Sequence, residues 1–371
     1  MAEVTAVSAT TMHEMAAYCK HFQDIISSLS RHASGDINSM LIYQEKCTSI
    51  CKHIDDNNSE IMTEATLHKY LQAIAQLVLD VTFLEEKSLI DEDFSNKSSF
   101  CRVWNVIDAL QSVEDLAYRI VQDKSVVDAL SSEITECLQW RKGALLYMYC
   151  HTINAQFSFE NLPFNFRQCL EEGIKYLTSM FCTRSPPKWL TGIISNRMES
   201  DSEQEADGEA SSTLLTQGIL SDTHLLALMY CGELCYWHTK LRRLPDKYEH
   251  VMEPVSGEIA RGAVDLSAHS VEINVLKYCS KINTTPDACD SIFASEHLKP
   301  CSSSSVCSSS EKNSTSTSNV AASNSETKID IEQIGKLCLE NYISAAHGPL
   351  VVGGWKTRRA EEILQYFYSQ K

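Results

Sequence analysis

No stretch of this 371-residue chain matches a recognised catalytic pattern. It contains no glycine-rich phosphate loop, no nucleophile elbow and no cysteine–histidine spacing typical of a zinc site. No apolar run approaches the roughly 20 residues that are needed to cross a bilayer. The first residues, MAEVTAVSATTMHEM, include acids and no long apolar core, so we expect no signal peptide. These absences favour a scaffold over an enzyme or a membrane-spanning protein.

Basic residues are scarce, with 32 Lys and Arg against 49 Asp and Glu and a net charge of −17. This balance argues against nucleic acid and anionic membrane surfaces as direct partners. Ala2 stands where N-myristoylation requires glycine, and the sequence shows no prenylation cysteine at its end. We therefore expect any membrane association to come through a partner, without direct insertion. The 15 cysteines are odd in number and follow no framework spacing, which indicates reduced thiols in the cytosol or nucleus.

Apolar residues recur at helical spacing along most of the chain, and we find no convincing strand pair. The run from Leu145 to Cys150 is apolar on every side, so that helix must be surrounded by protein. The pattern predicts an all-α fold, either a helical bundle or a helical-hairpin, solenoid-like scaffold with disordered insertions. Helices are predicted near residues 10–30, 37–54, 64–90, 100–121, 136–151, 163–182, 222–243, 330–347 and 357–367.

Four residues predict local features of these helices: three N-terminal caps and one close contact between helices. Thr63 and Asp222 are predicted N-caps, and Asp330 begins a pattern that resembles a capping box. Gly232 lies in the middle of a helix that is apolar nearly all round, where glycine costs roughly 1 kcal/mol against alanine. We expect Gly232 to allow another helix to approach closely.

Two segments differ from the rest in composition. One alternates acidic with small polar residues, and the other is dominated by Ser and Thr, so neither can bury enough apolar surface to offset the entropy cost of ordering. We expect a single helical domain that these segments interrupt. Its parts are residues 1–195, an acidic disordered loop at 196–213, a continuation at 214–245, a Ser-rich disordered linker at 246–328, and C-terminal helices at 329–371 that pack on the same domain.

Cysteine and histidine residues on one helix invite a metal interpretation. Cys231, Cys235 and His238 lie close along the sequence and could ligate zinc. A buried thiol pair in a core helix is the favoured interpretation, because no second ligand pair has suitable spacing. The same holds for Cys47, Cys51 and His53, so we expect no metal and no cofactor.

Asp91, Glu92 and Asp93 form an acidic turn beside Phe94. Helical isoprenoid synthases bind magnesium through Asp clusters on facing helices, but this chain shows one cluster and no basic diphosphate-binding run, so a magnesium-dependent enzyme is a weak alternative. The structural interpretation is a charged connection between helices. The functional one is an acidic contact to a basic partner surface, with Phe94 as its anchor.

Trp140 and Arg141 precede the apolar run, and residues of these types are enriched at protein interfaces. We include both in the possible partner interface, although Trp140 is more often a core residue. Trp140, Ala144 and Tyr147 approximate the first helix of a tetratricopeptide repeat, but nothing recurs at its period of roughly 34 residues. His151 is expected to be structural, because spacing places no carboxylate or nucleophile beside it.

Four blocks of the sequence together resemble one family. They are LDVTFLEEKSLIDEDF (79–94), ECLQWRKGALLYMYCH (136–151), GILSDTHLLALMYCGELCYWHTK (218–240) and GKLCLENYISAAHGPL (335–350), followed by Trp355 and AEEILQYF (360–367). The chain is similar in these blocks to the Rab-interacting accessory subunits of the Mon–Ccz complex. That complex is the guanine-nucleotide exchange factor of the late-endosomal Rab GTPase.

The resemblance implies a non-catalytic accessory subunit. Such a subunit would associate with the Mon–Ccz heterodimer, bind the Rab in its GDP form, and support Rab recruitment to late endosomes or lysosomes and, in mitophagy, to damaged mitochondria. The family offers no active-site motif to transfer onto this sequence. A general helical adaptor or co-chaperone-like scaffold that binds peptide segments is the alternative.

Overall fold

The computed structural model describes residues 9–29, 37–56, 63–121, 125–184, 186–195, 219–243, 330–348 and 350–369. In these ranges every regular element is a helix, which confirms the predicted all-α class. The helices are α1 (Ala9–Leu29), α2 (Ile37–Asp56), α3 (Glu64–Asp91), α4 (Ser99–Val121), α5 (Val126–Leu130), α6 (Ser132–Gln156), α7 (Phe166–Cys182), α8 (Lys188–Ser195), α10 (Asp222–Arg242), α12 (Ile331–His347) and α13 (Arg358–Ser369), with the short 3-10 helices η2 (Phe159–Asn161) and η4 (Val351–Gly353).

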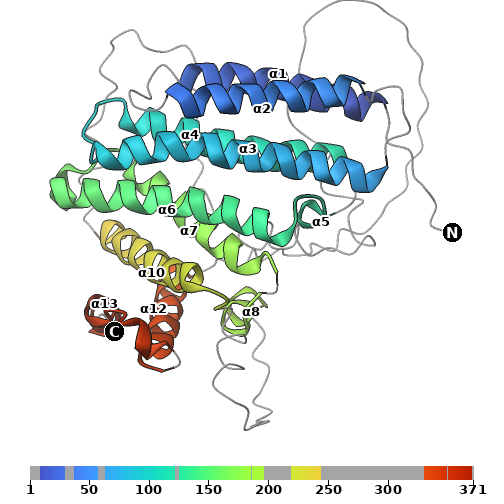
Figure 1. The fold of residues 1–371 in the computed structure, drawn as a ribbon. Coiled ribbons are helices and arrows are strands. Elements are labelled where there is room, and N and C mark those ends of the chain that lie inside the picture. The colour runs from blue at the N-terminus through green and yellow to red at the C-terminus, as the bar shows by residue number, and fades with distance from the viewer. Residues whose placement is uncertain are drawn as a thin grey trace, which may run out of the picture.

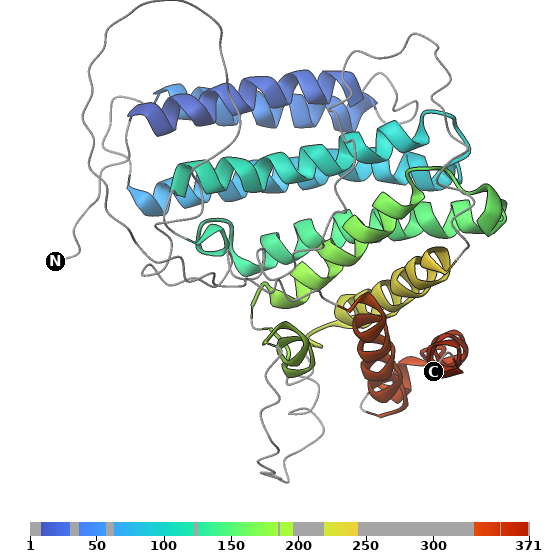
Figure 2. The same cartoon turned by 180° about the vertical axis from the view of Figure 1, so that it is seen from behind.

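The helices stack as antiparallel hairpins. The most extensive contacts join α6 to α7, α10 to α12, α3 to α4, α1 to α2 and α7 to α10. Successive hairpins pack side by side, with α2, α3 and α6 forming one face of the molecule (Figure 1) and α1, α4 and α7 forming the opposite face (Figure 2). None of the helices described is both long and apolar enough to span a membrane.

Most predicted helix limits agree with the structure to within a few residues. The side chain of Thr63 caps α3 by accepting a hydrogen bond from the amide of Thr66, and Asp330 caps α12. The predicted cap at Asp222 is wrong: Ser221 occupies the N-cap position, its hydroxyl lies 3.0 Å from the Nδ1 of His224 and makes no capping bond to the helix backbone, and Asp222 lies in the first turn. The segments 196–213 and 246–328 lie outside the described residues, so their predicted disorder stays a prediction.

Helix α6 lies at the centre of the stack, as its apolar sequence predicts. It packs against α3, α4, α5, α7 and α10. Leu145, Leu146 and Cys150 are completely buried, although they point in different directions around the helix axis. Tyr147 and Met148 are only half-buried, so the helix is not enclosed on every side as its sequence predicts. The polar groups on its buried faces require partners inside the protein.

Glycine brings α10 and α12 into close contact, which confirms the expectation for Gly232. A Cβ atom at Gly232 would lie 2.5 Å from Cγ of Leu339, and one at Gly335 would lie 2.7 Å from Cβ of Cys235. Each helix therefore presents a glycine to a side chain of the other. This pair joins the segment before residue 244 to the C-terminal helices.

Candidate functional site

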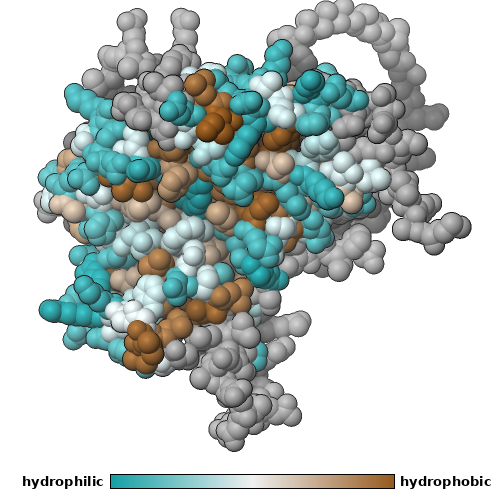
Figure 3. Space-filling view, in the orientation of Figure 1, coloured by the Kyte–Doolittle hydropathy of each residue, from teal (hydrophilic) through white to brown (hydrophobic). Residues whose placement is uncertain are grey.

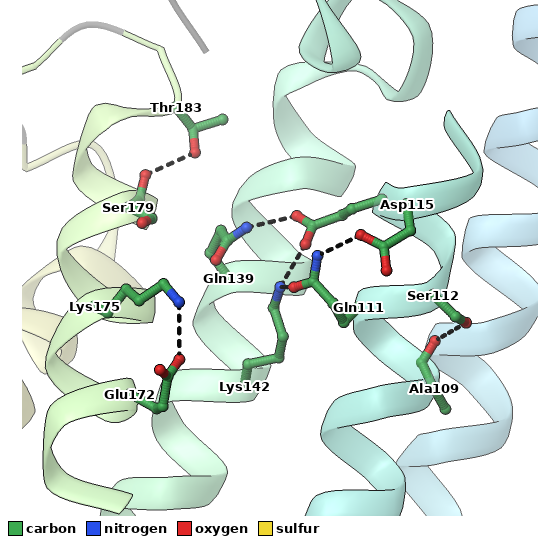
Figure 4. Close-up of polar contacts among 11 residues, drawn as sticks. Ala109, Gln111, Ser112, Asp115, Gln139, Lys142, Glu172, Lys175, Ser179 and Thr183 are labelled. Atoms are coloured by element: carbon green, nitrogen blue, oxygen red, sulfur yellow. Dashed lines mark hydrogen bonds and ion pairs between the residues drawn. The ribbon is translucent and has the colours of Figure 1, made fainter. Parts of the chain in front are cut away.

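Helix α6 carries a buried lysine whose charge is fully engaged by α4. Lys142 is 0% exposed, and its Nζ donates to Glu114 at 2.5 Å and to Gln111 at 2.8 Å (Figure 4). Gln139 donates to the other oxygen of Glu114 at 2.5 Å, and the Lys142 ammonium lies 4.6 Å from the ring centre of Tyr176. Burial lowers the pKa of Lys142, while Glu114 acts to raise it. Because the lysine touches no open space, this network holds α4, α6 and α7 together.

Arg141, one of the predicted interface residues, crosslinks α6 to α3. Its guanidinium donates to both carboxylate oxygens of Glu86, at 2.5 and 3.1 Å, and to the carbonyl of Leu79 at 2.5 Å. Burial raises the pKa of Glu86, and Arg141 opposes that shift. The guanidinium also lies 5.7 Å from the ring centre of Phe83. Arg141 is thus fixed by α3 and supports an aromatic ring on the surface of that helix.

A third ion pair links the beginning of α6 to the end of α7. Arg184 donates to both oxygens of Glu136, at 2.6 and 3.0 Å, and His224 of α10 lies 3.7 Å from the same carboxylate. Burial raises the pKa of Glu136, but hydrogen bonds with His224 and Arg184 outweigh it and lower the pKa below its ordinary value of 4.5.

Trp140, the other predicted interface residue of α6, is half-buried and packs against α10. Its ring stacks on Tyr230 of α10 at 5.6 Å, and Tyr230 stacks on Tyr147 at 3.8 Å. Tyr147 donates to Glu233, which also accepts a hydrogen bond from Arg359 of α13. The column joins α6, α10 and α13, so Trp140 has a structural role that accounts for its position. Its contribution to a partner interface stays a prediction.

The acidic turn after α3 is held by its aromatic residue. Phe94 is only 5% exposed and packs edge-on against Tyr149 at 5.8 Å, so its ring fixes the turn and is not available as the expected anchor. Asp93 and Phe94 both have φ of 49°, a strained region for residues other than glycine. Glu92 accepts from Arg102 and Ser88, and these bonds lower its pKa. Asp91 and Asp93 remain exposed, with no ion pair to any described residue.

Three thiols meet between α10 and α12. Hydrogen bonds from Cys235 and Cys338 lower the pKa of Cys231 well below its ordinary value. The zinc alternative finds no support here, because no group of three or more potential ligands with metal geometry occurs in the described ranges. His238 instead lies 3.2 Å from Glu171. Cys47 donates to the carbonyl of Cys19.

A surface groove between α2, α3 and α6 is the feature that the sequence analysis missed. Its volume is about 320 Å³, and it opens on the face shown in Figure 3, where apolar patches interrupt the hydrophilic surface. The lining residues are Tyr43, Gln76, Leu79, Asp80, Phe83, Glu133, Ile134, Cys137 and Arg141. Phe83 was the available signal, because it occupies the polar face of α3 in line with Gln76 and Asp80. Of the predicted interface residues, Arg141 alone lines this groove.

The residues described above therefore fall into two groups: buried charges that are paired inside the protein, and side chains that are exposed on the surface. The buried charges of α6 are paired, and of these Arg141 alone lines the surface groove. The surface of α3 and the turn that follows it instead offer the exposed apolar side chains Phe83 and Ile90, a groove, and the exposed carboxylates of Asp91 and Asp93. This combination suits contact with another protein better than catalysis.

Comparison with known proteins adds an independent observation. A family model described as "RAB7A-interacting MON1-CCZ1 complex subunit 1" matches residues 40–281 and 293–368. Curated proteins of the same description include a zebrafish (Danio rerio) relative, 40% identical over 177 residues, which are 47% of this chain and 60% of the relative. The human relative is 27% identical over 337 residues, covering 91% of this chain and 89% of the relative.

The mouse relative is 28% identical over 336 residues, covering 90% of this chain and 89% of the relative. The chain thus spans less than two thirds of the zebrafish protein in that match, but most of the human and mouse proteins. No solved structure matches the chain.

Proposed function

Because the chain belongs to the family of RAB7A-interacting MON1-CCZ1 complex subunits, we propose that it is a non-catalytic accessory subunit of a MON1–CCZ1 complex that also binds a RAB7A-type GTPase. The observation that carries this proposal is the family match, which reaches from α2 to α13. In this role the nucleotide exchange reaction belongs to the partner subunits, and no residue of this chain needs to touch nucleotide.

The finer function follows from the same premise. The subunit favours the GDP-bound GTPase, the substrate form of an exchange factor, and so brings it to the complex. It acts in the cytoplasm and is recruited through its partners to late endosomes, to lysosomes and, in mitophagy, to damaged mitochondria.

The acidic turn is the proposed beginning of the partner surface. Asp91 and Asp93 are exposed beside each other, and they follow directly on the open face of α3. Carboxylates at the C-terminal end of a helix oppose its dipole, at a typical cost of about 0.3–1 kcal/mol each. A basic partner surface would offset that cost.

Co-purification tests the proposed function. The tagged full-length chain is recovered from cells and probed for MON1, CCZ1 and RAB7A, with RAB7A locked in the GDP form in one sample and in the GTP form in another. We expect the exchange complex to be recovered, together with more GDP-locked than GTP-locked RAB7A.

Two other results would count against the proposal. Absence of all three proteins would overturn it. Recovery of unrelated proteins through peptide segments, regardless of nucleotide state, would favour the general helical adaptor instead.

A further inference from the structure

Three buried thiols meet where α10 and α12 approach each other closely. Cys231 and Cys235 lie one turn apart on α10, and Cys338 lies on α12. None of the three side chains is exposed. The thiols of Cys235 and Cys338 both lie within hydrogen-bonding distance of Cys231. Cys231 is therefore the centre of a cluster that spans two helices.

The close contact of the helices selects which of these thiols can be joined. Cys231 immediately precedes Gly232, and Cys338 immediately precedes Leu339, whose Cγ atom would lie 2.5 Å from a Cβ atom at Gly232. A disulfide needs two Cβ atoms about 3.5–4.5 Å apart. Cys231 and Cys235 are four residues apart on one helix, where Cβ atoms are about 5–6 Å apart, so this pair is too widely spaced. Cys338 on the opposing helix is the partner within reach of Cys231.

The hydrogen bonds also favour Cys231 as the thiol that loses its proton first. The bonds from Cys235 and Cys338 lower the pKa of Cys231, whereas burial raises the pKa of each of the other two thiols. The thiolate is the form of cysteine that reacts with oxidants. Cys231 is thus placed to react first, with a second thiol beside it to complete a disulfide.

An oxidant can reach these buried sulfurs only when α12 moves away from α10. Helices α12 and α13 are the last of the stack, and apart from each other they pack mainly on α10 (Figure 1). A unit at the end of a stack has a neighbour on one side only, so it opens at a lower free energy than the middle does. Opening of these two helices therefore exposes the cluster while the rest of the chain stays folded.

We infer that Cys231 and Cys338 form a reversible oxidation site, at which a peroxide creates a disulfide that ties α12 to α10. The Cys231 thiolate attacks one oxygen of hydrogen peroxide, which leaves a sulfenic acid on Cys231 and releases hydroxide. The Cys338 thiol then attacks the sulfenic sulfur, so the S–S bond forms and water leaves. In total two thiols lose two electrons and one peroxide becomes two waters. Exchange with a small thiol such as glutathione reverses the reaction.

The disulfide would change how firmly the C-terminal helices are held, whether or not the proposed function is correct. Cys231 and Cys338 are separated in the sequence by 106 residues. A crosslink that closes so long a loop removes much of the entropy of the open state. In the reduced protein α12 and α13 open and close, and in the oxidised protein they stay closed on α10.

The test is oxidation of the purified full-length chain with hydrogen peroxide, followed by alkylation of the free thiols and mass spectrometry of unreduced peptides. Cys150 of α6 and Cys169 of α7 are the matched control pair. They are equally buried and hydrogen-bonded to each other, but they join two helices in the middle of the stack. We expect a peptide that links Cys231 to Cys338, and at least about tenfold less linkage of Cys150 to Cys169.

Two variants and one exchange measurement sharpen the test. Cys338→Ala should leave the sulfenic acid on Cys231, where dimedone captures it, and Cys169→Ala should leave the linkage unchanged. Deuterium uptake by the amides of α12 should slow by at least about tenfold on oxidation and recover with dithiothreitol. The linkage and the uptake are measured in the unchanged chain, so neither depends on how well a variant folds.

Four outcomes would overturn the inference. Equal linkage of the control pair would show that oxidation follows unfolding of the whole chain. A peptide joining Cys231 to any cysteine other than Cys338 would show that the pairing is wrong. Unmodified Cys231 and Cys338 in a chain whose exposed Cys101 is oxidised would show that the cluster does not react. Deuterium uptake that is unchanged in the linked protein would show that the bond does not hold α12 closed.

Discussion

Helices α6 and α3 lie side by side, yet α6 buries charged side chains whereas α3 exposes a large apolar one. On α6 the charged side chains Arg141 and Lys142 are turned inward and bind carboxylates of the neighbouring helices. On α3 an aromatic ring, Phe83, is turned outward. Lys142 is structural because it is buried and paired, whereas Phe83 is 57% exposed and contacts the guanidinium of Arg141.

The comparison teaches where function is to be sought in a helical scaffold. A buried polar residue can suggest a functional site, but a structural role explains it when all its hydrogen bonds are made within the protein. An exposed large apolar residue beside a groove stays unexplained until a partner covers it. Here the second kind of residue lies on α3.

Removing the buried cation of α6 should have the largest effect on stability. Lys142→Ala leaves Glu114 as a buried charge without its cation, and such a loss typically costs about 3–5 kcal/mol. Urea unfolding of the variant and the unchanged chain measures the difference. The double variant Lys142→Met/Glu114→Met should lose less than Lys142→Ala, because no charge stays unpaired. An unfolding midpoint equal to that of the unchanged chain would show that the network contributes nothing.

Filling the contact between α10 and α12 should have the next largest effect. Gly232→Ala places a methyl group against Leu339, and overpacking of this kind costs about 1–3 kcal/mol, partly offset by the better helix propensity of alanine. In a double-mutant cycle with Leu339→Ala, the smaller residue should make room for the methyl group. Strict additivity of the two changes in unfolding free energy would contradict the close contact.

Acid should reveal the ion pair of Glu136. Its pKa in the folded protein is below the ordinary value of 4.5, so its stabilisation is present above that pH and is lost as the pH falls through the folded pKa. We expect Glu136→Gln, which cannot be protonated in this range, to show a smaller fall of Tm between about pH 6 and about pH 3. Parallel curves for the two proteins would mean that the carboxylate is not stabilised by Arg184 and His224.

Truncating the outward ring of α3 should have the smallest effect. Phe83→Ala removes mainly exposed surface and one contact with Arg141. We therefore expect the free energy of unfolding to change by less than about 0.5 kcal/mol. A loss of several kcal/mol would instead show that the ring is a structural residue.

Local sequence rules predicted much of this fold. The N-cap at Thr63 and the close approach at Gly232 each depend on residues within one helix or on a single steric property, and each agrees with the structure. The predicted burial of Leu145–Cys150 on every side is wrong in part, because Tyr147 and Met148 are only half-buried. The short helices α5 and α8 were not predicted, because five and eight residues are too few to establish a helical period.

Orientation between elements is what the sequence could not supply. Phe83 and Phe94 belong to one block, but only the second is buried, because two consecutive residues with positive φ turn it back towards Tyr149. Trp140 stacks on Tyr230 only because α10 happens to lie there. The groove likewise needs three helices at once, so no periodicity within α3 could show it.

The contact of α10 with α12 has a consequence for how members of such a family can differ. The two helices are separated in the sequence by the 86 residues from 244 to 329. The entropy of closing a chain grows only with the logarithm of its length, at about 0.6 kcal/mol for each doubling. An interface as closely packed as that of Gly232 and Gly335 can absorb this cost, so insertions and deletions in the connection leave the C-terminal helices in place. The length of the connection can therefore change at little cost in stability, whereas a larger residue at Gly232 or Gly335 requires the facing side chain to move or to shrink.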